Sequence, residues 1–363
     1  MSTSRKIYQF EGTFPLYRGG KIKSPAIAYE TWGELNSEAS NAILIFTGLS
    51  PSAHAASSPE DSSPGWWEDM IGPEHAIDTN KYFVVCVNSL GSCFGSTGPS
   101  SVDSSTGKPY FTNFPVLSLE DVARGGEVLL AYLGIDKLHA LIGPSMGGMS
   151  ALAFEVMFPG RTKSLLLIST CMRAASMSIA LRSLQREIIR SDPNWSQGFY
   201  SEKKLPIKGM RLARKLGMIT YRSSDEFTKR FGRERVSLGH EAEDKFSLDF
   251  QIESYMEHHA NAFTGQFDPN CYLYLSRASD LFDLADHGGS LEKAVERIAS
   301  RKVTIIGVKS DQLFPYWQQV ELFKLLNTQG REVDLVSLDC NQGHDSFLAS
   351  MDDFRPPVAS FLA

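Results

Sequence analysis

Short apolar runs alternate with longer amphipathic stretches along most of the 363-residue chain. Several of the runs are apolar without interruption, which is typical of strands buried on both faces of a parallel sheet. Helical patterns lie between them, and one begins at Ser118 with Asp121 three residues later, a variant of the capping box. The alternation of strands and helices indicates an α/β fold. The predicted strands are 26–33, 42–48, 82–88, 138–143, 164–170, 303–308 and 333–338, and the clearest helices are 118–134 and 146–158.

The pattern changes between residues 172 and 295, where charged amphipathic helical stretches follow one another with almost no strand signal. Strand-like runs resume at Val303. We therefore expect a core domain formed by 1–171 and 296–363, with a helical cap (lid) inserted at 172–295. Such a cap would cover the carboxyl edge of a mostly parallel sheet, where α/β folds bind their ligands.

Composition excludes several classes of function. The net charge is -6 and no basic stripe is visible, so we expect no nucleic-acid partner. The apolar runs are far shorter than the roughly 20 residues that span a bilayer, and the first residues lack the apolar centre of a signal peptide. Five scattered cysteines without a CxxC pair favour free thiols over disulfides or a zinc site. These features predict a cytoplasmic protein with no membrane partner and no metal.

The strongest chemical signal is the sequence Gly-Pro-Ser-Met-Gly at 143–147. It directly follows the predicted strand 138–143 and opens the predicted helix 146–158. A nucleophile elbow requires this strand–turn–helix setting, with small residues beside the serine because the turn is sharp. We therefore predict that Ser145 is a nucleophile. The alternative is a glycine-rich turn with an inert serine.

A serine hydroxyl needs a base, and the base needs an orienting carboxylate. His344 lies in the loop after the last predicted strand, and Asp311 follows the strand 303–308. The chain order Ser145, Asp311, His344 is that of the α/β-hydrolase fold, with all three at the carboxyl ends of strands. The remaining histidines have ordinary structural interpretations: His75, His139, His240 and His287 fit surface or satisfied positions, His258-His259 makes a poor metal pair, and His54 has a weak claim to a pocket.

An acyl-transfer site also needs two donors for the oxyanion. The backbone N–H of Met146, the residue after the nucleophile, is expected to supply one. The loop after the early strand 42–48 is expected to supply the other, and we favour the N–H of Leu49.

Together with further motifs, the triad sequence makes the chain closely resemble the homoserine O-acyltransferase family, whose members have the α/β-hydrolase fold. The similarity extends from YETWGELN (29–36) and GWWEDMIGP (65–73) through NSLGSCFGSTGPSS (88–101) to SDQLFP (310–315) and GHDSFL (343–348). The loop GLSPSAH (48–54) and the helix SIALRSLQREIIR resemble the serine O-succinyltransferase subgroup more than the commoner acetyltransferases.

The resemblance implies roles for further residues. Arg214 matches the family arginine that binds the amino-acid substrate, and Asp345 matches its substrate-binding aspartate. The residues Ser50, Pro51, Ser52 and Ala53 match a region tied to the choice of amino acid, and Arg182 matches a position tied to the choice of acyl-CoA. The chemistry of the substrates agrees with these roles. The guanidinium of Arg214 can bind the α-carboxylate of an amino acid, and the carboxylate of Asp345 can bind its ammonium group. The terminal carboxylate of a succinyl group needs a cation, which Arg182 or Arg186 could provide.

The expected activity is transfer of succinyl from succinyl-CoA to L-serine through an acyl-serine intermediate, without a cofactor. L-Homoserine differs from L-serine by one methylene, worth only about 1–3 kcal/mol in a pocket, so a homoserine O-succinyl- or O-acetyltransferase stays open. An esterase or thioesterase would use the same triad with water, although it has no need of Arg214 with Asp345. A non-catalytic binding protein is disfavoured by the intact triad. The family resemblance also implies a homodimer paired through the cap.

Overall fold

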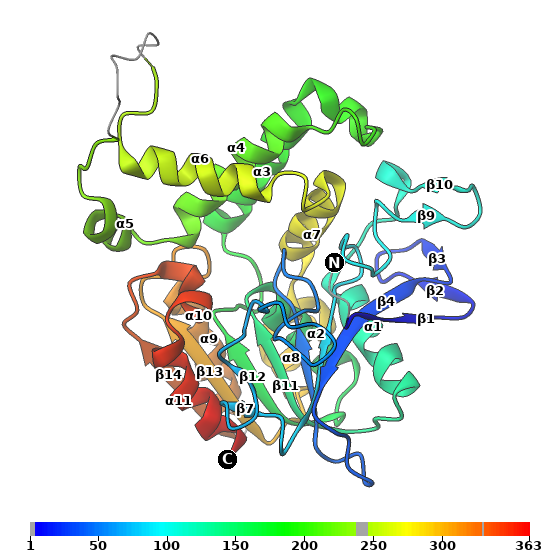
Figure 1. Ribbon diagram of the computed structural model, residues 1–363. Coiled ribbons are helices and arrows are strands. Elements are labelled where there is room, and N and C mark those ends of the chain that lie inside the picture. Colours follow the sequence, from blue (N-terminus) through cyan, green and yellow to red (C-terminus); the bar gives the residue numbers. More distant parts are fainter. Residues whose placement is uncertain (1–3, 237–245, 329) are drawn as a thin grey trace.

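The computed structural model describes residues 4–236, 246–328 and 330–363. Its centre is an eight-stranded sheet in the order β1-β4-β8-β5-β11-β12-β13-β14 (Figure 1). Pairing from β8 to β14 is parallel, whereas β4 runs antiparallel to both of its neighbours. The strands are β1 (Lys6–Gln9), β4 (Ala26–Trp32), β8 (Phe83–Val87), β5 (Ala42–Phe46), β11 (Leu138–Pro144), β12 (Thr162–Ile168), β13 (Lys302–Val308) and β14 (Glu332–Leu338).

All seven predicted runs are strands of this sheet, so the mostly parallel α/β architecture is confirmed. The sequence pattern missed β1, because this short edge strand is polar and mostly exposed. Three small ladders lie outside the sheet: β2 (Thr13–Pro15) with β3 (Lys21–Lys23), β6 (Ile71–Gly72) with β7 (Ile77–Asp78), and β9 (Val102–Asp103) with β10 (Lys108–Pro109).

Alternate residues of each strand enter two separate hydrophobic cores, which explains why the runs are apolar throughout. On β5, Leu44 and Phe46 pack on one face while Ile43 and Ile45 pack on the other. Helices α1, α2, α8 and α9 cover the first face, and α11 with the segment around Trp67 covers the second. These helices are α1 (Leu119–Tyr132), α2 (Met146–Met157), α8 (Leu291–Glu296), α9 (Tyr316–Asn327) and α11 (Met351–Leu362).

The predicted capping box is present at the start of α1. The Ser118 N–H donates to an Asp121 carboxylate oxygen over 2.9 Å, and the same carboxylate accepts the Tyr17 N–H over 2.7 Å. Asp121 therefore fixes both the start of the helix and the distant segment at Tyr17.

Helices α3 to α6 gather beyond one end of the sheet, at the top of the view in Figure 1. They belong to the segment between β12 and β13, where the sequence predicts the cap. The last turn of that predicted insertion, α8, packs into the core of the sheet through Leu291, Ala294 and Val295. The elements are α3 (Ser176–Ser191), α4 (Ile207–Tyr221), α5 (Ser224–Phe231), α6 (Gln251–Phe263) and α7 (Pro269–Leu281), with short α10 (Ser346–Ala349) and 3-10 turns η1 (Phe111–Asn113), η2 (Pro193–Gly198), η3 (Leu284–His287) and η4 (Gly343–Asp345).

Across the described parts of the chain, none of the helices combines the length and the apolar character that crossing a membrane requires.

Candidate active site

Ser145 occupies a sharp turn between β11 and α2. Its backbone has φ 57° and ψ -126°. A non-glycine residue rarely adopts a positive φ, but the sharp turn of a nucleophile elbow requires it. Glycine is needed around it because the helix starts close to the sheet. A Cβ at Gly147 would lie 2.2 Å from the Phe46 carbonyl oxygen, and one at Gly143 would lie 2.4 Å from the Gly147 carbonyl oxygen. The close packing therefore explains the small residues of the Gly-Pro-Ser-Met-Gly sequence.

The structure brings the three predicted triad side chains together. Ser145 Oγ lies 2.7 Å from His344 Nε2, and His344 Nδ1 lies 2.7 Å from Asp311 Oδ2. All three residues are buried. The other oxygen of Asp311 accepts the backbone N–H groups of Leu313 over 2.9 Å and Phe314 over 2.8 Å, which fixes the carboxylate. This arrangement lets His344 take the serine proton while Asp311 holds the ring.

The Phe314 ring stacks on the imidazole of His344 with their centroids 4.9 Å apart. Phe347 contacts the same imidazole edge-on at 5.6 Å. These contacts restrict rotation of the base, and they shield it from bulk water.

The two residues predicted to supply the oxyanion donors, Leu49 and Met146, line the same cavity as the nucleophile. Met146 is the first residue of α2, so its N–H has no acceptor within the helix. Leu49 follows β5 in the adjacent loop, and both residues line one cavity with Ser145. The positive end of the α2 dipole points to the same place. Leu49 and Met146 therefore stay the predicted sources of the two oxyanion donors.

The cavity has a volume of about 140 Å³ and is bounded by both the sheet loops and the cap helices. Its walls include Arg182 and Gln185 of α3, Arg214 and Tyr221 of α4, and Tyr272 of α7. Arginine side chains thus approach Ser145 from the cap, whereas the triad comes from the sheet.

Arg214 reaches the cavity as predicted, held by aromatic rings rather than by an acid. Its guanidinium carbon lies 4.5 Å from the centroid of Phe263 and 5.7 Å from that of Tyr221. Its buried Nε has no hydrogen-bond partner among the described residues. A buried donor without a partner is costly, so this arginine is suited to an anion that enters the cavity.

Asp345 also lines the cavity, and it forms an ion pair with Arg222, whose Nε lies 3.2 Å from Oδ2. Its side chain keeps 24% of its surface accessible. Protein surrounds it elsewhere, and this burial raises the pKa of Asp345 above the usual value, although Arg222, His344 and Arg214 act in the opposite direction. The carboxylate can bind an ammonium group next to the triad.

Arg182 is held by a buried acid that the sequence analysis did not identify. Its Nε donates to Asp280 Oδ1 over 2.6 Å, and Arg186 Nη2 lies 2.7 Å from the other oxygen of Asp280. Arg182 Nη2 is buried and has no partner among the described residues. Since Arg182 lines the cavity, this free N–H is a second place for an anion.

Of the four predicted residues of the 50–53 loop, two line the cavity and two do not. Ser50 and Pro51 line the cavity. Ser52 instead accepts the backbone N–H of His54 over 3.2 Å, and Ala53 is 1% exposed beneath the loop. His54 does not line the cavity, and its ring is bound to Glu30.

The other histidines lie away from the triad. His287 lies 3.1 Å from a carboxylate oxygen of Glu120, His139 packs on Tyr82 with centroids 4.9 Å apart, and His75 is exposed. His258 and His259 are neighbouring rings on α6. His240 lies outside the described residues. Within the described ranges, no group of three or more His, Cys, Asp or Glu side chains is arranged to hold a metal.

Tyr221, Tyr272, Arg222 and Asp280 are site residues that the sequence analysis did not single out. Tyr221 and Arg222 lie seven and eight residues after the predicted Arg214, so their neighbourhood was a signal. Nothing local marks Asp280 or Tyr272, because their importance depends on how α7 packs against α3.

Comparison with known proteins gives four findings. A family profile described as the alpha/beta hydrolase fold matches residues 41–348. The serine O-succinyltransferase of Litchfieldella anticariensis is 51% identical over 364 residues, covering 100% of this chain and 99% of that protein. Among solved structures, the homoserine O-acetyltransferase from Bacillus anthracis is 30% identical with a TM-score of 0.90, covering 99% of this chain and 97% of that one. Esterase E22 is 29% identical with a TM-score of 0.90, covering 99% of each chain.

Proposed function

The chain belongs to the homoserine O-acyltransferase family of α/β-hydrolase-fold enzymes, and we propose that it transfers a succinyl group from succinyl-CoA to the hydroxyl of L-serine. One observation carries the proposal. The hydrogen-bonded chain Ser145–His344–Asp311 opens into a cavity that holds two buried arginine N–H groups without partners, on Arg182 and Arg214. A succinyl donor and an amino-acid acceptor bring one carboxylate each, which matches two unpartnered cationic donors.

In the proposed first half-reaction, Ser145 Oγ attacks the thioester carbonyl and His344 Nε2 takes the serine proton. The developing oxyanion accepts the N–H groups of Leu49 and Met146. The tetrahedral intermediate collapses as the C–S bond breaks, and the departing thiolate receives the proton from His344. Free CoA leaves, and Ser145 carries the succinyl ester.

In the second half-reaction, the hydroxyl of L-serine attacks the ester on Ser145. His344 takes the hydroxyl proton and returns it to Ser145 Oγ as that oxygen departs. Arg214 would bind the α-carboxylate of L-serine and Asp345 its ammonium, so that the acceptor hydroxyl lies near the ester. The two steps balance with the two substrates alone, so we propose that no cofactor or metal takes part.

The experiment is a matrix of succinyl-CoA and acetyl-CoA against L-serine, L-homoserine and no acceptor, read by release of free thiol and by product mass. We expect the highest kcat/KM for succinyl-CoA with L-serine, and no thiol release from Ser145→Ala. Arg182→Ala should reduce kcat/KM for succinyl-CoA on the order of tenfold or more, because a charged hydrogen bond is lost, and it should spare acetyl-CoA. Equal loss with both donors would remove Arg182 from donor choice.

Hydrolysis is the second candidate, because esterase E22 shares the fold at a TM-score of 0.90. An esterase does not require a paired cation and anion for an amino acid, as Arg214 and Asp345 supply here. Thiol release at the same rate with and without an amino acid would favour hydrolysis. Preference for L-homoserine would instead favour the other acyltransferase activity.

We further propose that the protein works in the cytoplasm as a homodimer. All five cysteines are free, which suits a reducing compartment. The exposed apolar residues Leu184, Leu212 and Ile219 on the cap support the dimer.

A further inference from the structure

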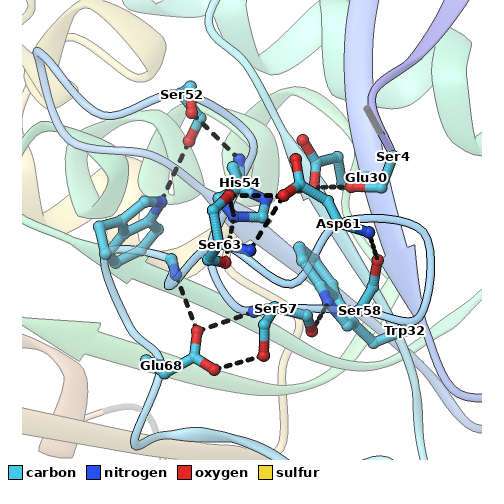
Figure 2. Close-up of polar contacts among 12 residues, drawn as sticks. Ser4, Glu30, Trp32, Ser52, His54, Ser57, Ser58, Asp61, Ser63 and Glu68 are labelled. Atoms are coloured by element: carbon cyan, nitrogen blue, oxygen red, sulfur yellow. Dashed lines mark hydrogen bonds and ion pairs between the residues drawn. The ribbon is translucent and has the colours of Figure 1, made fainter. Parts of the chain in front are cut away.

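His54 lies six residues beyond Gly48, in the loop that supplies the second oxyanion donor. Figure 2 shows its ring between the carboxylate of Glu30 and the backbone of Ser63. Nδ1 lies 2.9 Å from Glu30 Oε2, and Nε2 lies 2.9 Å from the Ser63 carbonyl oxygen. The His54 side chain is 11% exposed and that of Glu30 is 2% exposed.

Both neighbours of the ring are acceptors. An ionised carboxylate and a carbonyl oxygen carry no proton to share, so both ring nitrogens must donate, and only the imidazolium has two N–H groups. Glu30 Oε2 also accepts the Ser4 hydroxyl over 2.6 Å, which supports its ionised form. The ring of His54 is therefore charged and paired with Glu30.

This cluster superficially resembles a second catalytic triad, since Ser63 Oγ lies 3.2 Å from His54 Nε2. However, that hydroxyl donates to Asp61 Oδ1 over 2.5 Å, and Nε2 faces the Ser63 carbonyl oxygen at the shorter distance. A protonated ring cannot act as a base. The contacts therefore indicate a structural ion pair rather than a nucleophile.

The far half of the loop has its own anchors. Glu68 accepts the backbone N–H groups of Ser57 and Gly65, each over 2.7 Å, and Trp66 Nε1 donates to the Ser52 carbonyl oxygen over 3.0 Å. Gly65 approaches the loop so closely that a Cβ there would lie 2.1 Å from the Ala55 carbonyl carbon. The ends of the loop are thus drawn together.

The near half, which contains Leu49, Ser50 and Pro51, is held more weakly. The Pro51 carbonyl oxygen accepts Asn88 Nδ2 at 3.5 Å, the outer limit for a hydrogen bond. His54 is the charged anchor that follows these residues, and through Glu30 it joins them to β4 in the central sheet.

From these contacts we propose that His54 is a positioning residue: the imidazolium–Glu30 pair holds the loop so that the Leu49 N–H points at the oxyanion and Ser50 and Pro51 shape the cavity. The proposal rests on the acyl-enzyme chemistry proposed above. His54 contacts no substrate, and it acts through the loop backbone.

The charge of this pair depends on pH. Burial lowers the pKa of His54, but the hydrogen bonds to Glu30 and Ser63 and the charges of Glu30 and Asp61 outweigh it, so the pKa is raised above the ordinary value. The carboxylate of Glu68 is the other charged group nearby, and Cys86 of β8 lies in the field of Glu30. A raised histidine pKa gives stabilisation that is complete below the ordinary value and is lost as the pH rises through the raised value. The ion pair therefore holds the loop below the raised pKa of His54, and this anchor is lost as the pH rises through that pKa.

The test uses the full-length protein and a fluorophosphonate probe, which labels an activated serine and needs the triad and oxyanion hole but neither CoA nor an amino acid. Labelling of Ser145 is measured across pH for the wild type, His54→Gln, Glu30→Gln and the matched control His75→Gln, whose histidine is exposed. In parallel, NMR follows the histidine ring signals, with His54 assigned from its loss in His54→Gln.

We expect the His54 ring to be protonated at neutral pH, and His54→Gln to slow labelling on the order of tenfold or more while His75→Gln does not. Wild-type labelling should fall in alkaline solution as the His54 signal titrates, and Glu30→Gln should move both events to lower pH together. A neutral His54 ring at pH 7 would overturn the proposal, as would equal labelling of the wild type and His54→Gln. If His54→Gln does not fold, Glu30→Gln and the NMR titration decide. Probe labelling and the NMR titration use no succinyl-CoA, so they would still test the role of His54 if succinyl-CoA proved not to be the donor. The proposal for His54 and the proposed function can therefore fail independently.

Discussion

At the scale of single residues, the site is governed by an excess of buried positive charge. Arg182 and Arg186 share Asp280, and Arg222 is paired with both Asp345 and Glu226. Arg214 packs on aromatic rings and acts on Asp345 through its charge. These four guanidinium groups therefore share three carboxylates. Burying unpaired charge costs free energy, so these guanidinium groups favour ligands that bring carboxylates into the cavity.

Asp280 should matter for folding before it matters for catalysis. Replacing Asp280 with Asn leaves Arg182 and Arg186 side by side without a counter-charge, which we expect to lower the free energy of unfolding by about 3–5 kcal/mol. Denaturant unfolding measures this change. The control Asp352→Asn removes an exposed pair with Arg355 and should change the stability by less than about 1 kcal/mol. Similar stabilities for the two variants would contradict the structural role of Asp280.

Protonation of Asp345 at low pH should weaken the binding of the acceptor, L-serine, but not the binding of succinyl-CoA. Its raised pKa means that the carboxylate gains a proton at a higher pH than an ordinary aspartate does, and the protonated form cannot pair with an ammonium group. We expect the KM for L-serine to rise as the pH falls towards this pKa, while the KM for succinyl-CoA stays flat. Steady-state kinetics across pH would measure both constants.

The matched variant is Asp345→Asn, which keeps the shape of the side chain and removes its charge. It should raise the KM for L-serine on the order of tenfold or more at neutral pH and abolish the further rise of that constant at low pH. If the rise at low pH persists in this variant, it belongs to another group.

At the scale of elements, the site depends on how closely α2 packs against the sheet. The nucleophile sits at a strained turn, and the helix behind it approaches β5 so closely that no Cβ fits at Gly147. Strain at Ser145 is maintained because the packing on both sides fixes the backbone. The geometry of the nucleophile is therefore a property of β11, α2 and β5 together.

Alanine substitutions at two helical glycines, Gly147 and Gly125, distinguish the effect of close packing from the effect of helix propensity. Gly147→Ala would force a Cβ against the Phe46 carbonyl oxygen at 2.2 Å, whereas a Cβ at Gly125 in α1 meets only Ile27 at 3.4 Å. We expect Gly147→Ala to lower the free energy of unfolding by more than about 3 kcal/mol, or to prevent folding. Gly125→Ala should be neutral, or should stabilise by up to about 1 kcal/mol through its helix propensity. Thermal unfolding of the two variants measures the contrast, and equal tolerance would show that α2 can move away from β5.

The same elements show what the sequence could predict. Ser145, Asp311 and His344 were found because each lies at the end of a strand that local pattern reveals. Asp280 and the pairing of His54 with Glu30 were not found, because these contacts join elements that are far apart in sequence and have no local signature. Ser52 and Ala53 were tied to the choice of amino acid by resemblance alone, and neither residue is among those that line the cavity, because Ser52 Oγ accepts the His54 N–H and Ala53 is buried in the loop.

At the scale of the whole molecule, the cap presents apolar side chains to solvent in the monomer. Among the described residues, Leu184 on α3 and Leu212 and Ile219 on α4 are each at least 40% exposed. Leu212 and Ile219 are seven positions apart, so they lie on one face of α4. The opposite face of that helix presents Arg214 and Tyr221 to the cavity. Pairing of two caps through the outer face of α4 would therefore bury apolar surface and brace the cavity wall.

We expect the double substitution Leu212→Glu and Ile219→Glu to weaken the proposed homodimer on the order of 100-fold or more, because two apolar side chains per protomer would become charged in the interface. Light scattering after size-exclusion chromatography, over a range of protein concentrations, measures the mass. Trp317→Glu is the control, since Trp317 is 57% exposed on α9 of the core. A wild-type protein that is monomeric at micromolar concentration would end the dimer proposal. A dimer that survives the double substitution but not Trp317→Glu would move the interface from the cap to the core.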